Sequence, residues 1–231
     1  MPIQSIREKI NKALQDPNFA FVAKGSFHTL LSMGAVFFFR FLSGVIIARF
    51  YGPEVSGWLT NLMTFMAAFI ILGNFGIKDA MLKLIPEYKE KYNLKTAWAI
   101  YKKSIHLILF FWLICMALMY FLSDWQSKAW NVPNLKYYFQ ISGVFLIFLL
   151  LSEYNNFVLR SILKIQTANY NNIATLVSRV LIIAFLTLFF FNPYNPLMLQ
   201  FASGCFLAWL ISQISIYKHF SKPKKKKKVL A

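Results

Sequence analysis

The sequence predicts an all-α integral membrane protein with six transmembrane helices, and three observations lead to this fold class. Hydrophobic residues make up 58% of the 231 residues and charged residues only 14%, whereas soluble domains average about 45–50% and about 25%. Six long apolar stretches fill most of the chain, and an α-helix needs about 20 such residues to cross a bilayer. Finally, lysine and arginine are abundant in the segments on one side of the predicted membrane and scarce in the loops on the other side, as they are in multi-spanning proteins.

The N-terminal residues 1–24 are predicted to form a cytoplasmic amphipathic segment. They lack the apolar region and small-residue cleavage site of a signal peptide. Within them Ile3, Ile6, Ile10 and Leu14 recur at helical spacing between basic residues, a pattern typical of a short helix lying on the membrane surface. The alternative is a polar tail without regular structure.

The six-helix bundle is predicted over residues 25–217, with spans at 25–50, 58–77, 104–122, 137–157, 173–191 and 196–217. The second span reaches crossing length only if its helix continues through residues 73–77. The amphipathic, lysine-rich segment 78–103 is expected to prolong that helix beyond the membrane and then return along the surface. Residues 218–231 form a polybasic cytoplasmic tail, for which anionic lipid is the expected partner rather than nucleic acid.

The distribution of lysine and arginine sets the orientation. The net charge of +17 is concentrated before the first span, in residues 78–103 and after the last span. The loops at 51–57 and 192–195 contain no basic residue, and the loop at 123–136 contains only Lys128 and Lys136. Cytoplasmic loops carry the excess of basic residues, so both termini are predicted to be cytoplasmic.

Polar side chains follow one face of several spans, and two arginines lie inside the apolar stretches. Arginine at the centre of a membrane helix costs about 2.5–3.5 kcal/mol on insertion scales and usually faces a cavity or a partner. At 100° per residue, the polar residues of the first span lie within about 80° and those of the fifth within about 60°. The candidate cavity residues are Thr29, Ser32 and Arg40 on the first span, Glu153 on the fourth, and Asn172, Thr175 and Arg179 on the fifth.

Arg49, Asn156 and Arg160 are further candidates for the cavity. Glu153 and Arg160 are separated by about 10 Å along the helix axis, so Glu153 is expected to pair with Arg40 or Arg179 from another helix. Two alternatives remain open. An arginine–glutamate pair can simply hold two helices together, and arginines near span ends can extend to the interface.

The sequence gives no indication of an enzyme. Cys115 and Cys205 lie within spans and are interpreted as small packing residues. The three histidines are scattered, so no metal site, cofactor or nucleophile–base arrangement is expected.

Three stretches resemble one transporter family. Residues 44–57 (GVIIARFYGPEVSG) are similar to the end of the first helix and the following turn in polysaccharide flippases. Residues 74–87, beginning NFGI, resemble the end of the second helix, although Asn74 stands where the family often has aspartate. Residues 159–179, which include LRS, YNNI and LVSR, resemble the connection from the fourth to the fifth helix. The family is the multidrug/oligosaccharidyl-lipid/polysaccharide exporter superfamily, and the Wzx-type flippases resemble the chain most.

The resemblance implies a MATE-like transporter made of two six-helix bundles, of which this chain supplies one, with the substrate site between the halves. It implies a flippase in the bacterial cytoplasmic (inner) membrane, which moves undecaprenyl-diphosphate-linked oligosaccharide by alternating access for lipopolysaccharide or capsule synthesis. The second half would come from the same chain or from a second subunit. Three alternatives stay open: a lipid II flippase, a multidrug exporter of the same superfamily, and a non-transporting scaffold subunit of an envelope-polysaccharide assembly.

Overall fold

The computed structural model describes residues 17–130, 135–189 and 194–221, and every regular element within these ranges is a helix. The helices are α2 (Pro17–Tyr51), α3 (Pro53–Asn74), α4 (Ile77–Lys91), α5 (Leu94–Trp130), α6 (Leu135–Ser161), α7 (Ile165–Phe189) and α8 (Tyr194–Ser221). All of them except α4 contain a stretch long and apolar enough to cross a membrane. The predicted six-span, all-α multi-pass fold is therefore confirmed.

The candidate crossing stretches differ from the predicted spans mainly at their ends. They run Gly25–Tyr51, Pro53–Asn74, Leu94–Trp130, Lys136–Ser161, Ile165–Leu186 and Leu197–Phe220. Most are longer than the apolar runs because a helix continues past the hydrocarbon core into polar residues. The surface helix predicted within residues 1–24 falls largely on residues outside the described ranges, and from Pro17 onward the chain already belongs to α2. Most of the polybasic tail also lies outside them.

The second span ends earlier than predicted. Gly52 has a φ of 87° and is followed by Pro53, so α3 starts at the tight turn after α2. At the other end Phe75 and Gly76 adopt left-handed conformations, with φ values of 33° and 72°. Glycine adopts positive φ readily but other residues do so rarely, and two such residues in succession interrupt the helix. The predicted continuation through residues 73–77 is therefore wrong.

The segment after this break packs against the bundle instead of only lying on the membrane surface. In α4 the side chains of Ile77, Met81 and Ile85 are buried at a four-residue spacing, which places them on one face of the helix. This face packs on α5 and α6. On the exposed side Lys91 Nζ donates to Glu87 Oε1 at 2.7 Å, and this bond lowers the pKa of the Glu87 carboxyl. Residues 78–103 thus form α4 and the start of α5.

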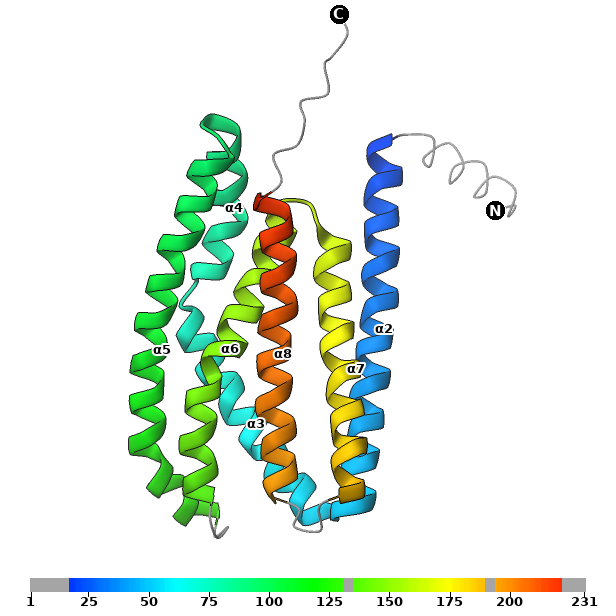
Figure 1. Ribbon diagram of the computed structural model, residues 1–231, viewed down its shortest axis with the longest axis vertical. Helices are drawn as coiled ribbons and strands as arrows, with labels where there is room; N and C mark the ends of the chain where they lie inside the picture. The colour runs from blue at the N-terminus through cyan, green and yellow to red at the C-terminus, as the bar shows by residue number, and fades with distance from the viewer. Residues whose placement is uncertain (1–16, 131–134, 190–193, 222–231) are drawn as a thin grey trace, which may run out of the picture.

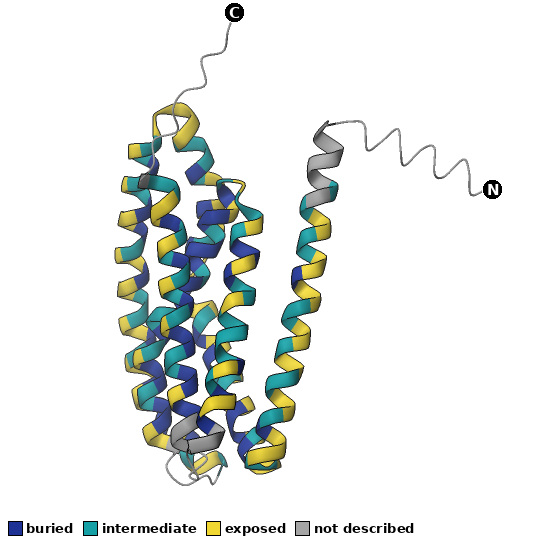
Figure 2. Cartoon of the chain, turned by 45° about the vertical axis from the view of Figure 1, so that its right-hand side comes forward, coloured by how far each residue is buried: buried dark blue, intermediate teal, exposed yellow. Residues whose placement is uncertain are grey.

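The long helices run side by side, with α3 crossing obliquely behind them (Figure 1). The first residues of α2 and the last residues of α8 lie at the same end of the bundle, as six crossings require. Which end faces the cytoplasm stays a prediction from the basic residues. Helix α2 stands at the edge of the bundle and packs on α7 and α3. Most of its surface is exposed or intermediate, whereas the buried residues gather in the other helices (Figure 2).

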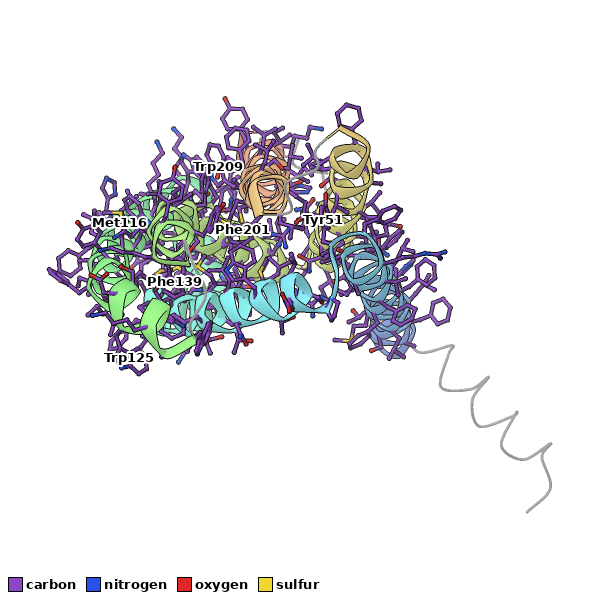
Figure 3. The ribbon with its side chains drawn as sticks, turned by 90° about the horizontal axis from the view of Figure 1, so that it is seen from below. Tyr51, Met116, Trp125, Phe139, Phe201 and Trp209 are labelled. Atoms are coloured by element: carbon purple, nitrogen blue, oxygen red, sulfur yellow. The ribbon has the colours of Figure 1, made fainter. Side chains whose placement is uncertain are left out.

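Large apolar side chains fill the space between the helices. Phe139 of α6 and Phe201 of α8 are almost fully buried and lie in the interior of the bundle, seen from below in Figure 3, while Trp125 of α5 lies at its periphery. The Phe139 ring meets the ring of Phe65 from α3 edge to face, with centroids 4.8 Å apart. This packing fixes the oblique α3 against α6 and so positions the walls of the site described below.

Candidate functional site

A pocket of about 600 Å³ lies between α2, α3, α6 and α7, and Ala208 of α8 also lines it. It gathers most of the polar residues that helical spacing had placed on inward faces. Its polar and charged lining residues are Arg40 of α2, Ser152, Glu153, Asn156 and Arg160 of α6, and Asn172, Thr175 and Arg179 of α7. Apolar residues of α3, including Ile70 and Ile71, complete the wall. Helices far apart in the sequence therefore contribute to one polar concavity within an apolar bundle.

Three arginines line this pocket without a carboxylate partner among the described residues. In the described part of the chain, Glu87, Asp124 and Glu153 form ion pairs, and each of these acids pairs with a lysine. Arg40 and Arg160 are exposed, and the Arg160 guanidinium carbon lies 5.7 Å from the centroid of the Phe157 ring. The positive charge of the three guanidinium groups is thus not neutralised by a carboxylate of the described residues.

Arg179 is the most enclosed of the three. Its Nη2 lies 3.9 Å from Cys205 Sγ of α8, and its buried Nε has no hydrogen-bond partner within the described part of the chain. The side chain lies across Gly204, where an added Cβ would come within 2.6 Å of Arg179 Cγ and Nε. The absence of a side chain at position 204 therefore gives Arg179 its place beside the pocket.

Glu153 does not pair with Arg40 or Arg179, so that expectation is wrong. Its Oε1 accepts from Lys78 Nζ and its Oε2 from Asn74 Nδ2, both at 2.8 Å. Asn74 ends α3 and Lys78 follows the Phe75–Gly76 break, and the change of direction at the break brings both side chains to α6.

Lys78 and Asn74 were not among the candidates from the sequence. In the sequence Lys78 is one of many lysines of a predicted cytoplasmic segment, and Asn74 is a departure from the aspartate of the resembling family. A usable signal was present nonetheless. The two residues are four positions apart at the end of a span, in a chain that has a single carboxylate deep in its fourth span.

Two asparagines of the pocket lining, Asn156 of α6 and Asn172 of α7, belong to a chain of hydrogen bonds that extends to α8. Asn156 Nδ2 donates to Asn172 Oδ1 at 2.9 Å, and Asn171 Nδ2 donates to Asn156 Oδ1 at 3.3 Å. Ser215 Oγ of α8 in turn donates to Asn171 Oδ1 at 3.1 Å. Interhelical hydrogen bonds between polar side chains hold membrane helices together. Asn156 and Asn172 therefore have a packing role as well as a place on the pocket wall.

A second buried network lies beside the first and was missed by the sequence reasoning. Tyr101 Oη of α5 donates to Asn155 Oδ1 at 2.8 Å. Asn155 Nδ2 lies 3.1 Å from Ser212 Oγ and 3.0 Å from Gln213 Oε1, both on α8. The network ties α5 and α8 to α6 through Asn155, the sequence neighbour of the pocket-lining Asn156, and none of its members lines the pocket.

Three predicted site residues lie outside this pocket. Thr29 Oγ1 donates to the Gly25 carbonyl at 2.9 Å and accepts from Asn169 Nδ2 of α7 at 3.3 Å. Ser32 lines a separate, mostly apolar pocket of about 580 Å³ between α2 and α7. Arg49 is exposed near the end of α2 and lines neither pocket. The polar stripe of α2 is therefore divided between the α7 contact and the arginine-lined pocket, because α2 leans on α7 along its length.

Comparison with known proteins matches the chain to a family. A family described as "Polysaccharide biosynthesis protein" matches residues 22–231, which include all of the pocket. No curated protein and no solved structure matches the chain.

Proposed function

The chain belongs to the polysaccharide biosynthesis protein family, and on this premise we propose that it moves a lipid-linked oligosaccharide across the bilayer. Family membership, together with six membrane-crossing helices, indicates membrane transport for polysaccharide synthesis. The finer proposal is a Wzx-type flippase that binds the diphosphate of an undecaprenyl-diphosphate-linked oligosaccharide.

The positive charge of the pocket carries this proposal. Arg40, Arg160 and Arg179 line it, while its one carboxylate, Glu153, is already bonded to Lys78 and Asn74. A guanidinium binds phosphate oxygens through two parallel hydrogen bonds. A pocket with three such groups suits a diphosphate and disfavours the organic cations that a multidrug exporter would carry.

The surroundings of the pocket agree with a lipid-linked substrate. Large apolar side chains of α2 such as Phe37 and Phe41 are exposed on the surface of the bundle, which lipid chains could cover beside the polar pocket. The sugar would occupy the pocket while the isoprenoid chain stays in the lipid. In the alternating-access scheme implied by the resemblance, a second six-helix bundle closes the pocket from the opposite side, and both termini of this bundle face the cytoplasm of a bacterial cell.

Arg40→Ala tests the proposal, with Arg49→Ala as a matched control. Both arginines are exposed on α2, so neither truncation should unfold the bundle, but only Arg40 lines the pocket. A hydrogen bond to a charged group contributes about 1.5–3 kcal/mol, which corresponds to about 10–150-fold in affinity. Binding of undecaprenyl diphosphate to protein in nanodiscs should weaken by this factor in Arg40→Ala.

The affinity and the thermal unfolding of Arg40→Ala are compared with those of the control Arg49→Ala. Arg49→Ala should bind like the unmodified protein, and thermal unfolding should be similar for both variants. If Arg40→Ala binds undecaprenyl diphosphate as tightly as Arg49→Ala does, the pocket is not the headgroup site and the proposal fails.

A further inference from the structure

We propose that Lys78 is a further phosphate-binding residue of the pocket, held by Glu153 as an ion pair and transferred to the substrate diphosphate when the headgroup binds. This inference rests on the proposed function, because it assigns an additional ligand to the same anionic group. It concerns a residue of α4, a helix that contributes no lining residue to the pocket.

The position of Lys78 brings its ammonium group to the pocket wall. Nζ lies 2.8 Å from Oε1 of Glu153, which itself lines the pocket. Nζ also lies 5.0 Å from the centroid of the Phe157 ring, and Arg160 Cζ lies 5.7 Å from the same centroid. Lys78 and Arg160 therefore contact the same aromatic ring, and this ring, Glu153 and Arg160 all line the pocket. The flexible lysine side chain, already bonded to one lining residue, needs only a change of rotamer to turn toward an anion in the pocket.

Helix α4 itself does not stabilise the positive charge of Lys78. Lys78 lies in the first turn of α4, directly after the Phe75–Gly76 break. The N-terminus of a helix carries a partial positive charge and favours anions over cations. The ammonium is stabilised instead from α6, by Glu153. The side chains of Lys78 and Glu153 are only 20% and 35% exposed, so solvent and salt screen this pair less than a surface pair.

An exchange of partners leaves the Glu153 carboxylate with one hydrogen-bond donor. When Lys78 turns to the phosphate, Glu153 keeps the hydrogen bond from Asn74 Nδ2 at 2.8 Å. The diphosphate bears more negative charge than one carboxylate and presents more acceptor oxygens to the three N–H groups of the ammonium. Asn74 thus has a defined part in the exchange, which an aspartate at this position could not perform.

A purely static role for Lys78 makes a different prediction. If Lys78 only neutralises Glu153, its removal exposes an unpaired carboxylate that repels the substrate, and neutralising Glu153 as well should cancel the loss. If Lys78 binds phosphate, its removal weakens binding even where position 153 carries no charge. The effect of Lys78→Gln in a Glu153→Gln background separates the two roles.

The experiment measures the affinity of undecaprenyl diphosphate for each variant in nanodiscs, with undecaprenol as the probe that lacks phosphate. Glu153→Gln alone should bind the diphosphate more tightly than the unmodified protein, because it removes a competing anion. Adding Lys78→Gln should weaken binding about tenfold or more, the size expected for one lost charge-assisted bond. Lys83→Gln, which removes an exposed lysine of α4, should have no effect, and undecaprenol binding should be equal in all variants.

Three outcomes would overturn the inference, and they are distinguishable. If the double variant binds like Glu153→Gln alone while Arg40→Ala still weakens binding, Lys78 is only a counter-charge and the headgroup site stands. If Glu153→Gln weakens binding, the carboxylate is not a competitor and the exchange is wrong. If the unmodified protein binds undecaprenyl diphosphate no better than undecaprenol, both the exchange and the proposed function are wrong.

Discussion

Replacing Gly204 with alanine should weaken diphosphate binding because it displaces Arg179. The added Cβ would lie 2.6 Å from Cγ and Nε of Arg179 and 3.0 Å from its Cδ. Non-bonded carbon atoms are most stable about 3.5–4.0 Å apart, so the middle of the arginine side chain must move by about 1 Å. The helix backbone is less free to move than this side chain. The guanidinium therefore shifts away from the position at which it meets the pocket.

The substitution should change the binding affinity and the folding stability by different amounts. A hydrogen bond between charged groups contributes about 1.5–3 kcal/mol, so loss of the Arg179–phosphate contact should lower affinity about 10–150-fold. Alanine is more favourable than glycine inside a helix by about 0.5–1 kcal/mol, which offsets part of the strain that the new methyl group creates. Gly204→Ala should therefore lose binding while its folding stability changes little.

The assay combines undecaprenyl diphosphate affinity with thermal unfolding, and Gly143→Ala is the control. Gly143 is also buried inside a helix, but its added Cβ would meet its nearest neighbour, Met119 Sδ, at an ordinary 3.6 Å, so this variant should bind normally. Because the effect acts through Arg179, Gly204→Ala should cause no further loss in an Arg179→Ala background. Unchanged affinity in Gly204→Ala would refute the reasoning, since Arg179 would then not need its present position.

Two further predictions concern the walls of the site. Asn155→Ala removes buried hydrogen bonds to α5 and α8; at about 0.6 kcal/mol for an average interhelical bond, plus the cavity left behind, it should lower the free energy of unfolding by about 2–4 kcal/mol. Unfolding in denaturing detergent measures this, and a change below about 0.5 kcal/mol would show that the network does not join the helices. Thr175→Cys should react with a membrane-impermeant thiol reagent and be protected by undecaprenyl diphosphate, whereas the buried Cys115 and Cys205 should remain unmodified. An unreactive Thr175→Cys would favour a packed scaffold over a transporter.

The number and type of the helices could be predicted from the sequence because the membrane leaves little choice. Backbone polar groups in hydrocarbon must bond internally, so an isolated apolar run of crossing length becomes a helix. The ends of the helices were less predictable. Apolar content marks the part of a helix inside the hydrocarbon, but α5 begins at Leu94, through a stretch containing Lys95, Lys102 and Lys103 that composition alone assigns to a loop.

The candidate site was predictable within each helix and unpredictable between helices. Spacing at 100° per residue correctly grouped Asn172, Thr175 and Arg179, which all line one pocket. Spacing fixes the direction of a side chain around its own helix axis but does not say which neighbouring helix it will face. The partner of Glu153 is unpredictable for this reason, and because apolar content does not reveal the helix break at Phe75–Gly76. Only the break brings Lys78 back to α6.

The pairing of Glu153 also bears on why the arginines are present. If the arginines only held helices together, the arrangement of lowest free energy would pair the one carboxylate of the pocket with Arg179. The buried Nε of Arg179 has no partner among the described residues. An intramembrane arginine costs about 2.5–3.5 kcal/mol even on insertion scales, and such a pair would reduce that cost. The fold instead bonds Glu153 to a lysine from outside the pocket lining. This arrangement leaves the guanidinium groups without a carboxylate partner in the described part of the chain, which fits the proposed binding of a diphosphate better than the locking of helices.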